Sequence, residues 1–512
     1  MKTARASKDL YRELRALPWP KLWLEEVPRF NAAAPRERFE RVSVIRAVGV
    51  VFEESGPKAQ KAEVKQWLLG LLQDPQEKIR RYAMAALPKF GVGLREEAAL
   101  LEVMKAAASE REKRSLGEVL SKVGGAATAE ALQTVTGFSA QVVQKVTASV
   151  ARSQSPSVLL FVRVISGFPG LRIHFRCRKG LERILRQEVD ERPQFRVLDM
   201  SPGLLVVQAP ESFCLSDLYQ LRCFDTLGFA LGQVRRSSEA ESVEALAAVI
   251  ASSLTLRLIE NLTEGSLRYR LDYIGKGHQR GAIRQVATRA FEQCPQILND
   301  AREAPWAIDV HPHALGDSVE LRPRLSPDPR HSYRLDAVPA ASHPPLAACL
   351  ARIAGKMPNE YVWDPFCGSG LELIEMARLG GVRRVFGTDL SEDAVGITER
   401  NFQAAELGAI QSTFACCDFR DFAGVEGLTP QTLTLVITNP PLGRRVPIPD
   451  LRLLIEDLFA VAAKMLQVGG RLVFVNPFKM ASPQRSMRLE FQQVVDLGGF
   501  DCRLEVYRKI SV

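Results

Sequence analysis

The chain has 512 residues, of which 46% are hydrophobic and 25% charged, so we expect a globular protein with about three domains. Its longest apolar run, Val158–Ile165, contains Arg163 and is far shorter than the ~20 residues of a membrane span. No secretory signal opens the chain, and its nine cysteines form no CxxC pair. We therefore expect a soluble, cytoplasmic protein with reduced thiols, no metal site and no membrane contact.

Residues 1–152 carry most of the net charge of +9, since they hold 26 Lys and Arg against 18 Asp and Glu. Apolar residues recur at helical spacing in segments 38–52, 59–73, 77–90, 95–108, 110–123, 127–134 and 139–151. The stretch Asp74–Gly91 resembles a HEAT-like repeat, with a weaker echo at 109–124; a non-repetitive helical bundle is the alternative. This all-α region is expected to extend an RNA-binding surface or to bind a protein partner, although its positive charge is equally that of a solvated helical surface.

Residues 158–335 alternate between strands and helices after the polar break Arg152–Ser157. Strands are expected at 171–176, 195–198, 203–208, 228–234 and 266–273, and helices at 180–189, 215–226, 243–253 and 282–294. The segments 178–182, 268–272, 281–285 and 325–334 resemble the ferredoxin-like segment and THUMP domain of RNA-modifying enzymes. That resemblance implies a module that grips the 3′ end of a structured RNA, with phosphate contacts from Arg268, Arg270, Lys276, His278, Arg280 and Arg284. A generic α/β domain with a solvated basic face is the alternative.

Residues 343–512 alternate regularly, which predicts a doubly wound α/β domain of Rossmann type with a parallel sheet. Strands are expected at 361–364, 384–388, 412–415, 433–438, 471–475 and 501–508, and helices at 346–355, 371–379, 394–407, 450–466 and 483–497. In such sheets the ligand lies beyond the carboxyl ends of the strands.

A glycine-rich turn, Asp364-Pro365-Phe366-Cys-Gly368-Ser-Gly370, joins the first of these strands to a helix, which lets a ligand approach the backbone. Asp389 ends the next strand, where a carboxylate can accept both hydroxyls of a ribose. Asp418 follows the third strand, in position to accept from an adenine amino group, and Phe419 or Leu390 can flank the ring. The missing Lys-Ser/Thr excludes a phosphate-binding P-loop.

A second motif, Asn439-Pro440-Pro441-Leu442, follows a Leu-Val-Ile strand. The Asn439 side-chain carbonyl and the Pro440 backbone carbonyl can both accept hydrogen bonds from one exocyclic amine, and two prolines make the loop rigid. This arrangement suits methylation of an amino group. A cytosine-C5 enzyme needs a nucleophilic cysteine in this loop, which is absent.

Together the two motifs resemble motifs I and IV of the Rossmann-type amino-methyltransferases, and specifically the THUMP-domain RNA guanine-N2 methyltransferases. The resemblance implies S-adenosylmethionine bound by Asp364, Pro365, Phe366, Gly368, Gly370, Asp389, Leu390, Asp418, Phe419 and Asn439, with Asn439, Pro440, Pro441 and Leu442 at the acceptor. It implies an enzyme of class EC 2.1.1 that methylates guanosine N2 in structured RNA, with tRNA favoured over rRNA. Arg444 and Arg445 follow, as candidates for a substrate phosphate or an ion pair.

Leu442 departs from that family, which places Tyr or Phe there to stack on a flipped base. A non-catalytic RNA-binding protein with a retained methyltransferase fold is therefore one alternative. An adenine-N6 methyltransferase is another, because Asn-Pro-Pro by itself does not separate adenine from guanine amino groups.

Overall fold

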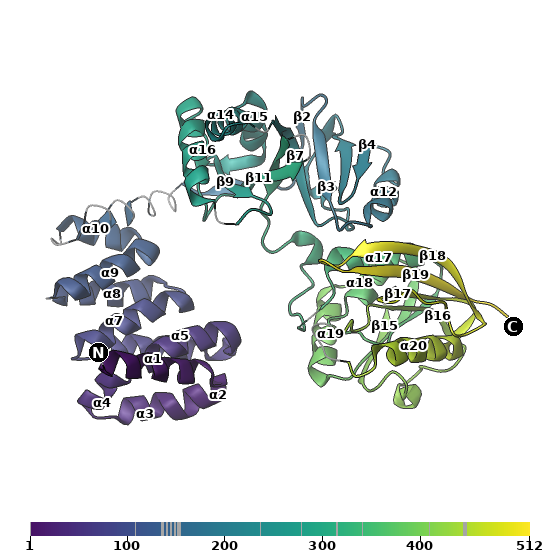
Figure 1. Cartoon of the computed structure of the whole chain (residues 1–512), viewed down its shortest axis with the longest axis horizontal. Helices are drawn as coiled ribbons and strands as arrows, with labels where there is room; N and C mark the ends of the chain where they lie inside the picture. The colour runs from purple at the N-terminus through teal and green to yellow at the C-terminus, as the bar shows by residue number, and fades with distance from the viewer. Residues whose placement is uncertain are drawn as a thin grey trace. The chain divides into compact units, whose positions relative to one another are not determined.

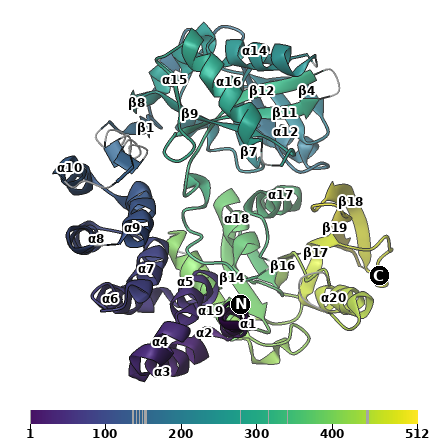
Figure 2. The same ribbon diagram turned by 60° about the vertical axis from the view of Figure 1, so that its left-hand side comes forward.

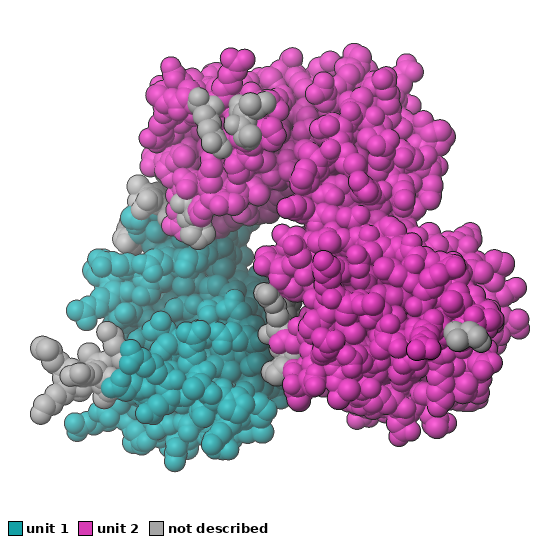
Figure 3. Space-filling model, turned by 45° about the vertical axis from the view of Figure 1, so that its right-hand side comes forward, with its two compact units in different colours: residues 1–156 teal, residues 157–512 magenta. Residues whose placement is uncertain are grey.

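The computed structural model describes residues 2–511 apart from positions 108, 135–137, 140–141, 144–145, 148–149, 151–154, 236, 278, 314–315, 340, 409 and 444–447. Its contacts divide the chain into two compact units, residues 1–156 and 157–512 (Figure 3). Each unit buries its own apolar core.

The described part of the first unit is helical (purple to blue in Figure 1). Its helices are α1 (Lys2–Arg15), α2 (Trp19–Lys21), α3 (Val27–Ala32), α4 (Pro35–Glu40), α5 (Ser43–Ser55), α6 (Lys61–Leu71), α7 (Glu77–Ala86), α8 (Leu94–Ala106), α9 (Glu110–Val123) and α10 (Ala126–Thr134). The short helical turns η1 (Leu22–Glu26), η2 (Lys58–Gln60) and η3 (Leu87–Phe90) lie between them. The helix predicted at 139–151 falls largely outside the described residues.

These helices pack in two interleaved series. Helix α7 packs on α5 and α9, while α8 packs on α9 and α10. Arg80 on α7 donates from Nε and Nη2 to the two carboxylate oxygens of Glu112 on α9, at 2.6 and 2.8 Å. Ser109 caps α9 by accepting from Glu112 N. Helices α5, α7 and α9 therefore pack in series, whereas α1 packs on α5, farther along the chain.

In its described residues the second unit contains an eight-stranded mixed sheet of order β10-β9-β11-β12-β7-β3-β5-β4. These strands are β3 (Arg172–Arg176), β4 (Arg196–Ser201), β5 (Leu204–Gln208), β7 (Thr226–Val234), β9 (Arg268–Tyr273), β10 (Leu298–Asn299), β11 (Trp306–His313) and β12 (Gly316–Pro323). Short pairs join β1 (Ser157–Leu159) to β8 (Thr263–Gly265) and β2 (Ile165–Ser166) to β6 (Ser212–Phe213). The helices are α12 (Glu182–Asp190), α13 (Leu215–Leu218), α14 (Glu239–Ile250), α15 (Ser253–Leu262) and α16 (Arg280–Gln293); α14 and α16 pack against β7 and β9 (Figure 2).

Two features of this sheet differ from the sequence-based expectation. The helix predicted at 215–226 is a single turn, α13, because Cys223 and Phe224 turn into the core and β7 begins at Thr226. Strands β11 and β12 were not predicted. Residues 306–310 of β11 are all buried, so they lack the polar alternation that signals a strand.

The described part of the C-terminal region holds a seven-stranded sheet of order β15-β14-β13-β16-β17-β19-β18. Its strands are β13 (Glu360–Asp364), β14 (Val382–Asp389), β15 (Gln411–Cys416), β16 (Leu433–Thr438), β17 (Leu466–Asn476), β18 (Met487–Asp496) and β19 (Asp501–Lys509). The helices are α17 (Pro344–Ala354), α18 (Leu371–Leu379), α19 (Glu392–Ala404) and α20 (Leu451–Met465), with turns η4 (Pro329–His331) and η5 (Phe422–Gly424).

The Rossmann-type prediction is correct for the parallel strands β13 to β17 and wrong at the far edge. There β19 runs antiparallel to β17, and β18 pairs antiparallel with β19. The helix predicted at 483–497 is strand β18. It pairs with β19 from Met487 to Asp496, with a register shift between Leu489 and Phe491, and this ladder pairing overrides the helical spacing of its apolar residues.

Within the described residues no single helix is long and apolar enough to cross a membrane; only α14 and α15 taken together, bent by 43°, have that length and composition.

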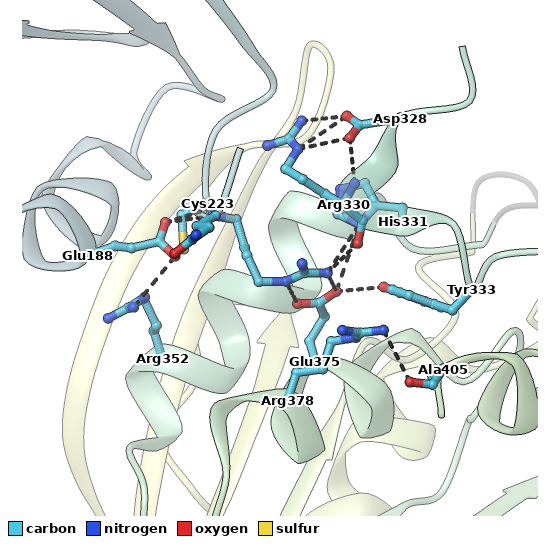
Figure 4. Close-up of polar contacts among 12 residues, drawn as sticks. Glu188, Cys223, Asp328, Arg330, His331, Tyr333, Arg352, Glu375, Arg378 and Ala405 are labelled. Carbon is cyan, nitrogen blue, oxygen red and sulfur yellow. Dashed lines mark hydrogen bonds and ion pairs between the residues drawn. The ribbon is translucent and has the colours of Figure 1, made fainter. Parts of the chain in front are cut away.

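A buried ion pair joins the eight-stranded-sheet region to the C-terminal region (Figure 4). Arg222 donates from Nε and Nη2 to the two oxygens of Glu375 on α18, each at 2.6 Å, and Tyr333 Oη donates to the same carboxylate at 2.5 Å. The Glu375 side chain is only 1% exposed. Nearby, Glu188 accepts from the backbone N–H groups of Arg222 and Cys223, at 2.9 Å each.

We expect Arg222→Met to lower the free energy of unfolding of the second unit by about 3–5 kcal/mol, because it leaves the Glu375 carboxylate buried without its cation. Adding Glu375→Leu should restore most of that loss, since the unpaired charge is then gone. Urea unfolding measures both. Arg186→Met on α12 is the matched control; that arginine is exposed and pairs only with Asp190, so a change under about 0.5 kcal/mol is expected. Equal effects of the two arginine substitutions would contradict a structural role for the buried pair.

Candidate active site

Four neighbouring parallel strands, β15, β14, β13 and β16, end at the same edge of the C-terminal sheet. A cavity of about 1230 Å³ lies at this edge. Among its lining residues are the predicted site residues Pro365, Phe366, Gly368, Asp389, Leu390, Asp418, Phe419, Asn439, Pro440, Pro441 and Leu442. Both sequence motifs therefore face one space, as the convergence of parallel strand ends requires.

The glycine turn depends on left-handed backbone at Gly368 (φ +51°) and Gly370 (φ +79°). A Cβ at Gly370 would lie 3.0 Å from Thr398 Cγ2, so a side chain there would be both strained and crowded. Gly368 N donates to Asp389 Oδ2 at 3.0 Å, which fixes the turn to the end of β14. Gly370 does not line the cavity; it starts α18.

Asp364 is fully buried behind the cavity wall, where it joins the two motifs. Its Oδ1 accepts from Thr438 Oγ1 at 2.6 Å and from Phe366 N at 3.0 Å, whereas its Oδ2 has no hydrogen-bond partner in the described structure. Burial, with a further contribution from the charge of Glu372, raises the pKa of Asp364 well above its ordinary value. A cation or a hydrogen-bond donor placed beside this buried, unpartnered carboxyl oxygen would stabilise it.

A hydrogen-bond chain fixes the side chain of Asn439. Its Nδ2 donates to Ser342 Oγ at 2.9 Å, and Ser342 Oγ donates to Glu372 Oε1 at 2.5 Å. When Glu372 is ionised, Ser342 gives its single proton to the carboxylate and can only accept from Asn439, which requires the NH2 side of the amide. Asn439 Oδ1 is consequently turned the other way; it is buried and has no partner among the described residues.

Neither Ser342 nor Glu372 was predicted as a site residue. Ser342 lies 97 residues from Asn439 in sequence, and no local pattern connects them. Glu372 is a charged residue in the first turn of α18, where residues 371–377 are all buried. A charged residue among apolar neighbours at the start of a predicted helix is the sequence feature that could have singled it out.

Phe366 and Phe419 form the aromatic part of the cavity wall, with ring centroids 4.9 Å apart. Asp418 accepts from Arg420 N and from Arg420 Nη1, each at 2.9 Å. Leu390 is 74% exposed at the opening. An apolar ring next to a carboxylate suits a planar heterocycle with an amino group.

The segment that precedes α17 closes the cavity on one side, and Asn401 on α19 holds it there. Asn401 Oδ1 accepts from Leu335 N at 2.9 Å, and its Nδ2 donates to Ser369 O in the glycine turn at 2.9 Å. Ser369 Oγ in turn accepts from Val338 N at 3.0 Å. These contacts, which the sequence did not predict, attach the segment before α17 to the glycine turn.

The predicted phosphate-contact residues lie elsewhere, on β9, α16 and the turn between them. Arg268 does not suit such a contact, because it is 3% exposed and its Nη1 lies 3.5 Å from Glu303. Arg270 pairs with Asp272, and Lys276 with Asp317. Arg280 and Arg284 are exposed on α16, whereas His278, Arg444 and Arg445 lie outside the described residues.

All nine cysteines are unpaired in the structure, and seven of them are buried. In the described part of the chain no group of three or more His, Cys, Asp or Glu side chains could hold a metal ion.

Comparison with known proteins identifies the C-terminal domain. Residues 331–496 match the UPF0020 model, described as an RMKL-like methyltransferase domain. A tRNA (guanine(10)-N2)-dimethyltransferase of Methanothermobacter thermautotrophicus is 30% identical over 148 residues, 28% of this chain and 41% of that protein. A tRNA (guanine(6)-N2)-methyltransferase of Thermus thermophilus is 30% identical over 211 residues, 40% of this chain and 61% of that protein.

The chain thus spans about half the length of these curated relatives. Among solved structures, TrmN from Thermus thermophilus superposes with a TM-score of 0.52 at 23% identity, covering 66% of this chain and all of that one, which shows a shared fold. The matches to the methyltransferase-domain model and to both relatives are thus partial, and the solved structure shares the fold.

Proposed function

We propose that this chain is an S-adenosylmethionine-dependent RNA methyltransferase, of class EC 2.1.1, that methylates the exocyclic N2 of a guanosine in tRNA. The observation that carries the proposal is the fixed orientation of Asn439, whose Oδ1 is left without a partner beside Pro440 and Pro441. An oriented carbonyl in a rigid loop at a methyltransferase cavity suits an amine substrate. The guanine-N2 activity of the two tRNA-modifying relatives supports guanosine as the base.

The cavity suits S-adenosylmethionine by its charge. Asp364 Oδ2 has no partner among the described residues, and both Asp364 and Glu372 are buried acids with raised pKa values, so a cationic ligand would offset their burial. Asp389 and Asp418, with Phe419, would hold the ribose and the adenine. S-adenosylmethionine supplies an electrophilic methyl group when bound.

The protein's own contribution is to orient the acceptor. Asn439 Oδ1 and the Pro440 carbonyl accept the two N–H groups of the amine, which turns the nitrogen lone pair out of conjugation with the ring. Ser342 and Glu372 keep the Asn439 amide from rotating. The apolar face of Leu442, which packs partly against the core, takes the place of an aromatic side chain beside the base.

The remaining regions supply RNA contacts in this proposal. Residues 158–335 would be the ferredoxin-like and THUMP-like module and residues 343–512 the catalytic domain, with Arg270, Lys276, Arg280 and Arg284 as phosphate contacts. Residues 1–152 would be a HEAT-like array, as the serial packing of α5, α7 and α9 supports, and would bind RNA or a protein. The cytoplasmic location and the role of Arg444 and Arg445 stay predictions.

The function is tested by methyl transfer from radiolabelled S-adenosylmethionine to total tRNA and rRNA, followed by nucleoside analysis. We expect N2-methylguanosine in tRNA, and a loss of about 10²-fold or more in kcat for Asn439→Ala, because the amine loses an oriented acceptor. Ser342→Ala should lower kcat by about 10-fold, since the amide is then free to rotate. Cofactor affinity should change little in Ser342→Ala, whereas it can fall in Asn439→Ala, because Asn439 is also an expected cofactor contact.

Two outcomes favour the alternatives. Labelled N6-methyladenosine would make the acceptor base adenine. No transfer to any RNA despite measurable cofactor binding would favour the RNA-binding protein, with Leu442 as the cause.

Glu372→Gln should stabilise the cofactor-free protein in a pH-dependent way. Burial, with repulsion from Glu375, raises the pKa of Glu372 to about 7, although the Ser342 hydrogen bond opposes the rise. The wild-type protein therefore loses stability as the pH rises from about 4.5 to about 7, because the unfolded chain releases the proton that the buried carboxyl still holds. The glutamine variant has no such proton and shows no such loss. We expect the variant to be more stable by about 3 kcal/mol at pH 8 but by under about 1 kcal/mol at pH 5.

Urea unfolding at the two pH values measures this difference, and titration calorimetry should show weaker binding of cationic S-adenosylmethionine to the variant. Exposed Glu399 on α19 gives the control, Glu399→Gln, which should show no such pH dependence. A stability difference equal at both pH values would rule out a raised pKa for Glu372.

A further inference from the structure

Two arginines face the cavity from outside the methyltransferase motifs. Arg178 lies between β3 and α12, and Arg334 lies between η4 and α17; both line the cavity together with Asn439. Neither guanidinium makes a hydrogen bond or salt bridge to any residue that the structure describes, and the Nε atom of each is buried without a partner. An arginine that is partly buried and unpaired is uncommon, because such groups are normally satisfied.

The backbone on both sides of these arginines is held firmly. Lys179 O accepts from Asp496 N at the end of β18, at 2.9 Å, and Gly180 has φ +102°. A Cβ at Gly180 would lie 2.0 Å from Val494 O, so this close approach to β18 requires glycine. Arg334 follows Tyr333, whose hydroxyl is bonded to Glu375. The two guanidinium groups are therefore presented by fixed backbone rather than by mobile loops.

The surroundings of the two arginines are electropositive. His343, also in the lining, has a pKa lowered to about 4 by burial and by Arg178, Arg334 and Arg330, so it stays neutral near pH 7. Arg330 is bonded to Asp328, and Asp225 lies 3.4 Å from His343. Burial raises the pKa of Asp225, and Arg178 and Arg330 oppose the rise.

The cavity is consequently polarised. Glu372, Asp389 and Asp418 line it on the side of the strand ends, and Asp364 lies behind them. Asp418 pairs with Arg420, which also lines the cavity, whereas the Asp389 carboxylate repels an anion and Arg178 and Arg334 attract one. An anionic group of a ligand is thus directed to the arginine side, and a cationic or neutral group to the carboxylate side.

We propose that Arg178 and Arg334 form a phosphodiester-binding site that holds the backbone of the target nucleotide while its base lies against Asn439. Guanidinium groups match the geometry of phosphate oxygens, and two unpaired ones can hold a single phosphodiester from two sides. A nucleotide turned out of an RNA brings its own phosphates to the mouth of the pocket that takes its base. The inference rests on the proposed function, since it assumes an RNA substrate in this cavity.

The test compares the full-length wild type with Arg178→Gln, Arg334→Gln and the corresponding lysine variants. Filter binding of total tRNA is measured between 50 and 200 mM KCl, in the presence of S-adenosylhomocysteine. Each glutamine variant should reduce the slope of log affinity against log salt concentration by about 1, as expected for the loss of one phosphate contact, and the lysine variants should keep the slope. Arg186→Gln, an exposed arginine on α12 paired with Asp190, is the matched control and should leave the slope unchanged.

Calorimetric titration of S-adenosylmethionine into the same variants separates a phosphate from the methionine carboxylate as the anion. Unchanged cofactor affinity is expected. A fall in cofactor affinity with an unchanged salt slope would overturn the proposal and assign the arginines to the carboxylate, and unchanged slopes in both glutamine variants would overturn it outright. A wild type that binds tRNA but transfers no methyl group would contradict the proposed enzyme activity. A reduced salt slope in the glutamine variants would in that case still support the phosphate site.

Discussion

The arrangement of the second unit depends on the buried carboxylate of Glu375. It lies on α18, the helix that begins at the glycine turn, and it is held by Arg222 from the eight-stranded-sheet region and by Tyr333 from the segment before α17. A buried carboxylate without its arginine is strongly unfavourable, so α18 cannot shift without breaking this pair. The same helix carries Glu372 three residues earlier. The interaction that joins the two parts of the unit therefore also positions one wall of the cavity.

The chemistry of the cavity follows from what this framework holds in place. Glu372 is kept in an apolar setting that raises its pKa, and through Ser342 it decides which face of the Asn439 amide is turned outward. Burial of the Glu372 and Asp364 carboxyl groups lowers the stability of the protein when no ligand is bound. Such stored free energy is typical of binding sites, where stability is traded for an oriented and charged surface.

Sequence patterns predicted the strand ends and hence much of the site. Asp389, Asp418 and Asn439 each follow a parallel strand, so their convergence is a consequence of topology. Ser342, Glu372 and Asn401 could not be predicted in the same way, because their roles arise from contacts between segments distant in sequence. Strand β18 was mistaken for a helix because hairpin pairing, a non-local interaction, overrode its local spacing. Arg268 was misjudged because burial is not visible in a motif.

The polarity of the cavity links these observations to the substrate. A neutral base can reach Asn439 on the carboxylate side only if the negative charge of its own backbone is kept away from Glu372 and Asp389. Arg178 lies before the segment that matches the methyltransferase-domain model and Arg334 lies near its start, on segments fixed by β18 and by Tyr333. A free-standing Rossmann-type domain would lack Arg178. In the proposed function the preceding region therefore contributes Arg178 to the cavity, in addition to any RNA surface of its own, and the interface held by Glu375 becomes part of substrate recognition.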